Sequence, residues 1–451
     1  MFTNLRMVNF KSWADTGDVR LAPLTVLFGG NSTGKSGLLQ MLLLLKQTTE
    51  SRDRNQVLQT GTDDPRSYVE LGTPSEIAHF DEKEMGFAVE WNWPEEEHRN
   101  HPLSYIKAGY TKESEICSLR LDTTIHAVHK PAFPTLVSYS QGQSECEELR
   151  VWVRQQDGSA YPYGYEVGIT FGERDEKLAP GDRGPTHVVL PTKCYSFPQS
   201  AKSMLSPHAY LSDDLEWKFE EQFQRLHYLG PLREYPLRVY TWAGERPVNV
   251  GIRGERAVQA LLAAGLNDKV FGQLGKLELA QSFEVRPLAE GDILYEVRLR
   301  SHLAAHEVLL PDVGFGVSQV LPVLVQCLYA PEHSTIILEH PDLHLHPSAQ
   351  VGLADFLIDV MRQRNLQLIV ESHSEHLIRR LQRRTAEEAL DPEDVALYFC
   401  DIHDGVSQLE LLQLDKYGRI SNWPDGFFGD MTGDVVKVLK KGLSKKIATN
   451  A

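Results

Sequence analysis

Residues 24–36 read Leu24-Thr-Val-Leu-Phe28 and then Gly29-Gly-Asn-Ser-Thr-Gly34-Lys35-Ser36. An apolar strand here leads into glycines, a lysine and a serine at the G-x-x-x-x-G-K-[ST] spacing of a phosphate-binding loop. In such a loop the backbone N–H groups point inward and the following helix adds the positive end of its dipole, so a polyphosphate is favoured there. The residues expected to contact the phosphates of ATP are Gly29, Asn31, Ser32, Thr33, Gly34, Lys35 and Ser36.

The residues on both sides of the loop support this prediction. Val26, Leu27 and Phe28 are typical of a buried strand, and the apolar residues between Leu38 and Leu45 fall on one face of a helix. Lys35 is expected to reach the β- and γ-phosphates, and the Ser36 hydroxyl is expected to hold Mg²⁺.

The composition is that of an ordinary soluble globular protein. The chain has 451 residues, of which 41% are hydrophobic and 24% are charged, enough for two or three cores. The first residues lack the apolar core of a signal peptide, and no apolar run is long enough to span a bilayer, so we expect a cytoplasmic protein without a membrane partner. The five cysteines are scattered and form no C-x-x-C pair, which favours reduced core thiols: Cys117, Cys146, Cys194, Cys327 and Cys400.

The formal net charge of −16 argues against indiscriminate binding to duplex DNA. Two local basic clusters keep DNA binding as an alternative, although both are more typical of solvated surfaces. They comprise Arg379, Arg380, Arg383 and Arg384 in one helical stretch, and Lys437, Lys440, Lys441, Lys445 and Lys446 near the C-terminus.

Changes in residue pattern along the chain divide it into five parts. Short β-rich runs separated by turns fill the second part, whereas apolar positions at helical spacing dominate the third, within 211–226 and 256–277. We expect an N-terminal half of a nucleotide-binding head (1–85), a β-rich inserted lobe (86–200), a helical segment (201–281), the C-terminal half of the head (282–413) and a tail (414–451).

Three later segments narrow the class of phosphate-loop protein. Val313-Gly-Phe-Gly-Val-Ser-Gln-Val-Leu-Pro322 opens an apolar helix, whose free N–H groups suit an anion. The segment Thr335-Ile-Ile-Leu-Glu339-His340-Pro-Asp-Leu-His-Leu-His-Pro347 is a buried strand that ends in an acid, where such ATPases need a carboxylate for Mg²⁺. Leu366-Gln-Leu-Ile-Val-Glu-Ser-His-Ser374 is another buried strand, and it ends near His373.

In this order the four segments resemble the ABC/SMC-like ATPases of bacteria, which are related to the ATPase domain of the OLD family. Flanking pieces of a stand-alone subgroup are present as well, at residues 9–12, 229–234 and 418–428. The resemblance is strong at both ends of the chain and thin over residues 86–225. It implies an α/β ATPase head that binds ATP and Mg²⁺, and members of the subgroup are often parts of antiphage systems.

The resemblance also implies roles for single residues. Gly316 and Ser318 would contact the nucleotide of a second subunit in a head-to-tail dimer, and His373 would be the switch histidine. Most of the class ends the second segment in Asp-Glu, with Asp for the metal and Glu for the attacking water, whereas this chain has Glu339 and His340. We therefore expect Glu339 to hold the metal with Ser36, His340 to act as the base, and turnover to be slow. The alternative is that Glu339 itself orients the attacking water.

Several side chains leave alternatives open. His344-x-His346 has a spacing common in metal sites, but the ATPase context already explains that loop. Trp13 is either an adenine-stacking surface or a core residue, with the core favoured. Arg233 either reaches a phosphate across a dimer or pairs with an acid such as Glu234.

At the level of function, the expected protein is a sensor or regulator that acts through ATP-dependent engagement on a separately encoded effector such as a nuclease. No nuclease centre is visible in the sequence, and residues 414–451 are too short for a domain of ordinary size. The alternatives are a scaffold that binds ATP without hydrolysing it and an SMC-like DNA clamp.

Overall fold

The computed structural model describes residues 1–53, 56–61, 67–92, 116–128, 132–143, 149–155, 165–171, 174–178, 193–198, 202, 209–289, 291, 293–301 and 306–424. Some residues named from the sequence lie outside these ranges. They are Cys146, the five C-terminal lysines and residues 425–428, together with the side chain of Cys117.

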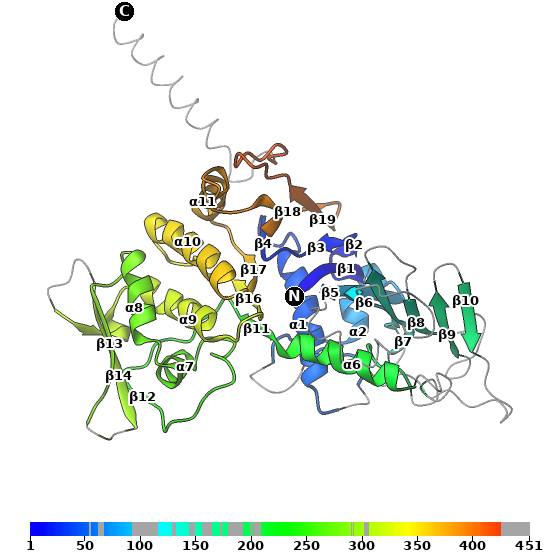
Figure 1. Ribbon diagram of the computed structural model, residues 1–451, viewed down its shortest axis with the longest axis horizontal. Helices are drawn as coiled ribbons and strands as arrows, with labels where there is room; N and C mark the ends of the chain where they lie inside the picture. The colour runs from blue at the N-terminus through cyan, green and yellow to red at the C-terminus, as the bar shows by residue number, and fades with distance from the viewer. Residues whose placement is uncertain are drawn as a thin grey trace, which may run out of the picture.

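A six-stranded sheet runs through the centre of the molecule in the order β11-β16-β17-β4-β18-β19 (Figure 1). The first five strands are parallel, and β19 is antiparallel to β18. Their bounds are β4 Leu24–Gly29, β11 Leu226–Leu229, β16 Thr335–Glu339, β17 Gln367–Glu371, β18 Val395–His403 and β19 Val406–Leu412. Since parallel strands end at the same edge, the carboxyl ends of β4, β16 and β17 lie together, where ligands bind in open α/β sheets.

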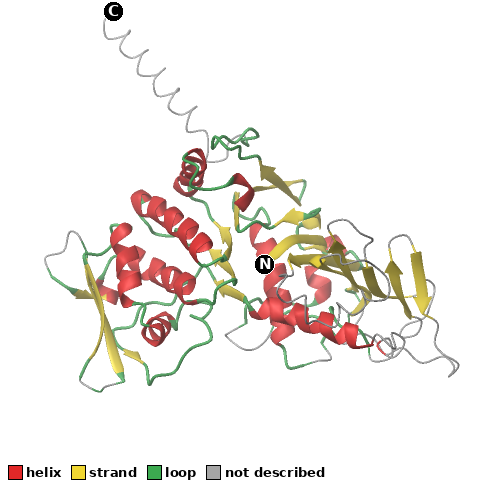
Figure 2. Cartoon of the chain, in the orientation of Figure 1, coloured by secondary structure: helices red, strands yellow, loops and turns green. Residues whose placement is uncertain are grey.

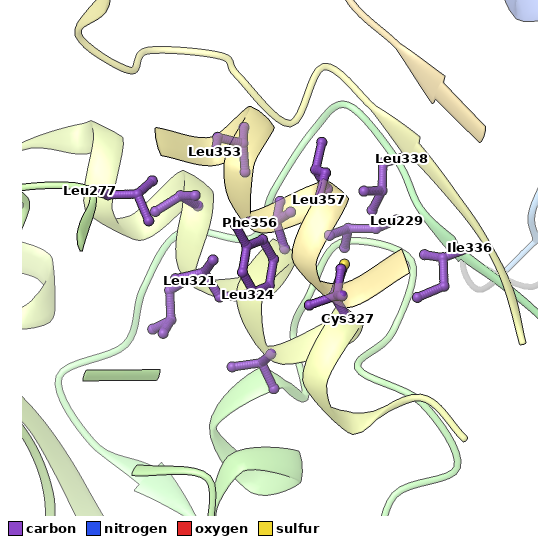
Figure 3. Packing of buried hydrophobic residues seen from close by; sticks show 14 of the residues in the cluster. Leu229, Leu277, Leu321, Leu324, Cys327, Ile336, Leu338, Leu353, Phe356 and Leu357 are labelled. Atoms are coloured by element: carbon purple, nitrogen blue, oxygen red, sulfur yellow. The ribbon is translucent and has the colours of Figure 1, made fainter. Parts of the chain in front are cut away.

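Both faces of this sheet are buried, which explains why its strands are nearly continuous apolar runs. Leu27, Ile337 and Ile369 face one core, and their neighbours Val26, Leu338 and Val370 face the other. Figure 3 shows the second core, in which Leu324 and Cys327 of one helix and Phe356 and Leu357 of another pack with residues of β11 and β16. The expected α/β fold class is confirmed.

A nine-stranded antiparallel sheet carries the N-terminal hairpin and the β-rich region together. Pairing of β5 with β1 joins the two, so the β-rich strands continue the sheet of the hairpin (Figure 1). The strands are β1 Phe2–Phe10, β2 Trp13–Asp15, β3 Val19–Arg20, β5 Glu84–Asn92, β6 Ile116–His126, β7 Phe133–Gln143, β8 Leu149–Gln155, β9 Tyr165–Phe171 and β10 Arg174–Leu178.

The helices lie in two groups, one in each of the two cores beside the central sheet (Figure 2). They are α1 Lys35–Glu50, α2 Pro74–Ile77, α6 Ala209–Gln224, α7 Ala257–Ala264, α8 Asn267–Lys276, α9 Phe315–Tyr329, α10 Pro347–Gln363 and α11 Glu375–Ala386, with 3₁₀ turns at His79–Asp81, Leu310–Asp312 and Pro392–Asp394. The apolar stretch over 256–277 forms two helices, because Gly265 adopts φ 61° and its N–H caps α7.

A small third sheet completes the fold beside α7 and α8. Its strands are β12 Tyr240–Thr241, β13 Ser282–Pro287, β14 Leu294–Arg300 and β15 Val308–Leu309. Cys194, Cys327 and Cys400 are buried and free, as predicted for core thiols. None of the helices in the described ranges combines the length and the apolar character that crossing a bilayer requires.

Candidate nucleotide-binding site

The phosphate loop connects β4 to α1 and depends on two glycines. Gly29 has φ 139° and Gly34 has φ 96°, backbone angles that residues other than glycine rarely adopt. A Cβ atom on Gly29 would lie 2.2 Å from the carbonyl oxygen of Cys400, and one on Gly34 would lie 2.4 Å from Oγ of Ser407. The loop is therefore packed tightly against β18 and β19.

The other loop residues divide into exposed and buried positions. Asn31 and Ser32 are exposed, and Ser32 has a positive φ of 62°. Thr33 is buried and donates a hydrogen bond from Oγ1 to the carbonyl oxygen of Gly30 at 3.0 Å. Lys35 is only 3% exposed, and its Nζ donates to the carbonyl oxygens of Gly29 at 3.2 Å and Gly30 at 2.6 Å. The ammonium charge is thus held inside the loop.

Trp13 packs against the phosphate loop. Its side chain is fully buried, and its indole Nε1–H donates to the carbonyl oxygen of Gly34 at 3.1 Å. The neighbouring Ser12 and Ser407 hydroxyls lie 2.6 Å apart and tie β19 to the same region. Trp13 is a core residue in this structure, in agreement with the favoured alternative.

Glu371, at the end of β17, is the carboxylate that contacts the phosphate loop. Ser36 Oγ donates to Oε2 of Glu371 at 3.1 Å, and Lys35 Nζ lies 3.8 Å from Oε1. No role was predicted for Glu371 from the sequence. Its position as an acid at the end of a buried strand, the same signal that singled out Glu339, would have identified it.

Glu339 lies on the neighbouring strand, in register with Glu371. Tyr228 Oη donates to Oε1 of Glu339 at 2.8 Å, and Arg233 Nη2 donates to the backbone oxygen of Glu339 at 3.0 Å. Burial raises the pKa of Glu339 to about 7, and the nearby Glu371 adds to that shift. In this structure the Ser36 hydroxyl meets Glu371, while Glu339 stands one strand further from the loop.

The donor set suits a hard divalent cation. A serine hydroxyl and two carboxylates offer only oxygen ligands, which are those that Mg²⁺ prefers. Two adjacent buried carboxylates also repel each other unless a cation lies nearby. The residues Ser36, Glu339 and Glu371 therefore fit the metal that phosphate-loop ATPases use.

His340 and His373 follow the two acids and stack on each other. Their ring centroids are 5.2 Å apart at an interplanar angle of 15°. The N–H of His340 donates to the backbone oxygen of Glu371 at 2.9 Å, which fixes the turn after β16. Burial, with help from Lys35 and His340, lowers the pKa of His373 and favours its neutral form.

Gly316 and Ser318 lie in the first turns of α9, beside the loop that follows β16. A Cβ atom on Gly316 would lie 2.9 Å from the carbonyl oxygen of His344. Ser318 is buried, and its Oγ donates to the carbonyl oxygen of Phe315 at 2.8 Å. Within the described part of the chain, no hydrogen bond joins either residue to the phosphate loop.

The histidine pair His344 and His346 has structural partners. The His344 ring packs edge-on against Phe315 at 5.1 Å, and Nδ1 of His346 accepts from the N–H of Ser348 at 3.3 Å as the cap of α10. Over the described ranges, no three His, Cys, Asp or Glu side chains converge on a point that would hold a metal ion. The metal alternative for these histidines gains no support.

The arginines of α11 are largely neutralised by acids. Arg380 and Arg384 both bond to Asp355 of α10, at 2.6 Å and 2.7 Å. Arg379 lies 3.3 Å from Glu375, and Arg383 lies 2.7 Å from Glu387. This cluster is therefore a set of ion pairs, two of them to α10 and the others within α11 and its C-terminal cap, rather than a free basic patch.

Two protein-family models match parts of the chain. Residues 211–379 match a family described as "AAA domain, putative AbiEii toxin, Type IV TA system". Residues 390–438 match a family described as "Protein of unknown function (DUF3696)". The first match contains β16 and β17 with their acids and supports a P-loop ATPase domain, to which the loop between β4 and α1 adds the phosphate-binding element.

Several solved structures of SMC head domains are similar to the chain at low identity. The SMC head bound to the C-winged helix domain of ScpA is 13% identical, with a TM-score of 0.44 over 92% of this chain and 98% of the other. The SMC head domain from Thermotoga maritima is 10% identical, with a TM-score of 0.38 over 91% and 99%. The Pyrococcus furiosus head with an extended coiled coil, bound to the C-terminal domain of ScpA, is 10% identical, with a TM-score of 0.38 over 92% and 97%. Comparison with curated protein sequences gives no match.

Proposed function

We propose that this protein binds ATP together with Mg²⁺ and hydrolyses it slowly. The observation that carries the proposal is the meeting of Lys35, Ser36 and Glu371 at the carboxyl edge of the central sheet, with Glu339 on the next strand. A lysine, a hydroxyl and carboxylates in this arrangement are the groups that phosphate-loop ATPases use to bind a triphosphate and its metal.

Each residue has a role in the proposal. Lys35 and the loop N–H groups hold the phosphates, while Ser36, Glu339 and Glu371 hold Mg²⁺, which when bound stabilises the charge of the transferred phosphoryl group. His340 orients or deprotonates the attacking water, and His373 contacts the terminal phosphate. We expect slow turnover because a glutamate and a histidine replace the Asp-Glu pair typical of the class.

We further propose that two subunits engage head to tail, so that Gly316 and Ser318 of one subunit complete the site of the other. The start of α9 presents an aromatic surface for such a contact. Phe315 is 50% exposed, and the exposed ring of Tyr235 lies 6.5 Å from it. Exposed aromatic side chains grouped in this way are typical of interaction sites.

The biological role that we propose is that of an ATP-dependent sensor or regulator in the cytoplasm, acting on a separately encoded effector such as a nuclease, in antiphage defence. Two facts support this role: the resemblance to stand-alone ATPases of conflict systems, and the match to a family described by a putative toxin. The ion-paired arginines of α11 give no support to the DNA-clamp alternative.

Replacement of Lys35 by Ala tests the nucleotide site. The variant loses the only cation in the loop sequence, and each charge-assisted hydrogen bond contributes about 1.5 to 3 kcal/mol, so ATP binding measured by calorimetric titration should disappear while the fold remains. Lys276→Ala, at an exposed lysine of α8, is the matched control and should bind ATP like the wild type. ATP affinity near that of the wild type in a folded Lys35→Ala protein would contradict the assignment.

A wild type that binds ATP without measurable steady-state hydrolysis would instead support the scaffold alternative.

A further inference from the structure

Arg233 is a partly buried arginine, most of whose donors have no hydrogen-bond partner among the described residues. It follows β11, and within the described ranges only its Nη2 has a partner, the backbone oxygen of Glu339 at 3.0 Å. Its Nε and Nη1 atoms are shielded from solvent and have no hydrogen-bond partner among the described residues. Burial lowers the pKa of Arg233 to about 10, so the side chain is still a cation at neutral pH.

The backbone around Arg233 is held in place on both sides. The N–H of Gly230 donates to Ile252 at 2.8 Å, and the N–H of Glu234 donates to Arg253 at 2.9 Å. Glu234, the acid considered from the sequence as its partner, is exposed and makes no ion pair with Arg233 in the described structure. Glu339 and Asp342 attract the guanidinium electrostatically, but neither carboxylate accepts a hydrogen bond from it among the described residues.

An unpaired donor in a protein interior is costly, and buried polar groups of this kind call for a specific explanation such as a ligand. The planar fork of an arginine matches the oxygens of a phosphate and binds them with two parallel hydrogen bonds. Arg233 is joined to the last residue of β16, and that strand ends at the edge of the sheet that carries the phosphate loop. A phosphate of the bound nucleotide is therefore the anion that best fits the free donors of Arg233.

We propose that Arg233 binds the terminal phosphate of a nucleoside triphosphate and so makes the site distinguish ATP from ADP. This inference rests on the proposed function, because it requires a nucleotide in the loop that contains Lys35. The backbone next to Arg233 bonds to Arg253, and the following Gly254 packs so closely on Pro322 of α9 that a Cβ atom there would lie 2.5 Å from it. Arg233 is therefore joined, through residues 253 and 254, to the helix that carries Gly316 and Ser318.

The test compares ATP and ADP affinities, with Mg²⁺ present, for Arg233→Met and the wild type. The variant should bind ATP at least tenfold more weakly and ADP within twofold of the wild type, because only ATP carries the phosphate that Arg233 would bind. Its melting temperature without nucleotide is measured in parallel, because Arg233 also donates to the backbone of Glu339 and a cooperative transition shows that the variant is folded. Arg238→Met is the control, because Arg238 is exposed in the same loop and pairs with Asp312.

Arg233→Lys keeps the positive charge and removes the planar fork, and it is the variant to test if Arg233→Met does not fold. It should also weaken ATP binding several-fold without a matching loss for ADP. An equal loss for ATP and ADP in a folded variant, or unchanged affinity for both, would overturn the inference while leaving the nucleotide site intact. If Lys35→Ala binds ATP as well as the wild type, the proposed function and this inference fail together.

Discussion

At the scale of single residues, two adjacent glutamates dominate the electrostatics of the site. Glu339 and Glu371 face each other across a parallel strand pair, and both are nearly buried. The pKa of Glu339 rises to about 7 because burial disfavours its charged form and Glu371 is a second negative charge nearby. Lys35, 3.8 Å from Glu371, offsets part of this charge. A divalent cation at Ser36 would offset the rest.

The two glutamates should therefore differ in how they affect Mg²⁺. Glu371→Gln should remove most of the gain in ATP affinity that Mg²⁺ provides, because it weakens the ligand that lies closest to Ser36. The measurement is ATP titration with Mg²⁺ and with a chelator, and Glu393→Gln at an exposed site is the control. A Mg²⁺ gain that survives in Glu371→Gln and vanishes in Glu339→Gln would assign the metal to Glu339 alone.

His340→Ala should keep the Mg²⁺ gain in ATP affinity and lower kcat by about a hundredfold, the usual size of a general-base contribution.

At the scale of elements, the strands and helices that carry the site follow from local pattern. The apolar runs before Gly29 and before Glu339 predict β4 and β16, and the leucines after Ser36 predict α1. Contacts between elements do not follow in the same way. Glu371 meets Ser36 only because β17 lies between β16 and β4, and the order of strands in a parallel sheet is not written in any one segment. Trp13 reaches Gly34 through the same kind of long-range pairing.

β11 also carries a buried histidine, His227, which gives the fold a measurable pH dependence. Burial, with a smaller contribution from Lys46, lowers the pKa of His227 to about 4. Between about pH 6.5 and pH 4 the unfolded chain binds a proton at this position and the folded chain does not. The contribution of His227 to the free energy of unfolding should thus be fully present above pH 6.5 and be lost, by about 3 kcal/mol, as the pH drops to 4.

His227→Gln should flatten this dependence in urea denaturation measured across that pH range. His403→Gln, at an exposed histidine of β18, is the control and should follow the wild type. If the difference between wild type and His227→Gln does not change with pH, the buried histidine does not titrate as proposed.

At the scale of the whole molecule, the central sheet carries the phosphate loop and the start of α9 on separate elements. Lys35 begins α1 after β4, whereas Phe315 begins α9, which packs in the other core with α10 (Figure 3). In the described residues these two groups share no hydrogen bond or ion pair. The proposed head-to-tail engagement requires Gly316 and Ser318 to be separate from the phosphate loop of their own subunit, and this arrangement agrees with it.

Mixing two inactive variants tests that engagement. Ser318 is buried, so a large residue there would disturb α9, whereas Phe315 is exposed and Phe315→Glu adds a negative charge that repels a partner's phosphates without altering a core. In a mixed dimer of Lys35→Ala and Phe315→Glu subunits, one composite site combines both changes and the other combines neither. ATPase activity should therefore return to about half of the wild-type rate per dimer, although each variant alone is inactive. Phe271→Glu, at an exposed phenylalanine of α8, is the matched control and should stay active by itself. Verified mixed dimers without activity, or a monomeric Phe315→Glu protein with full activity, would show that each subunit completes its own site.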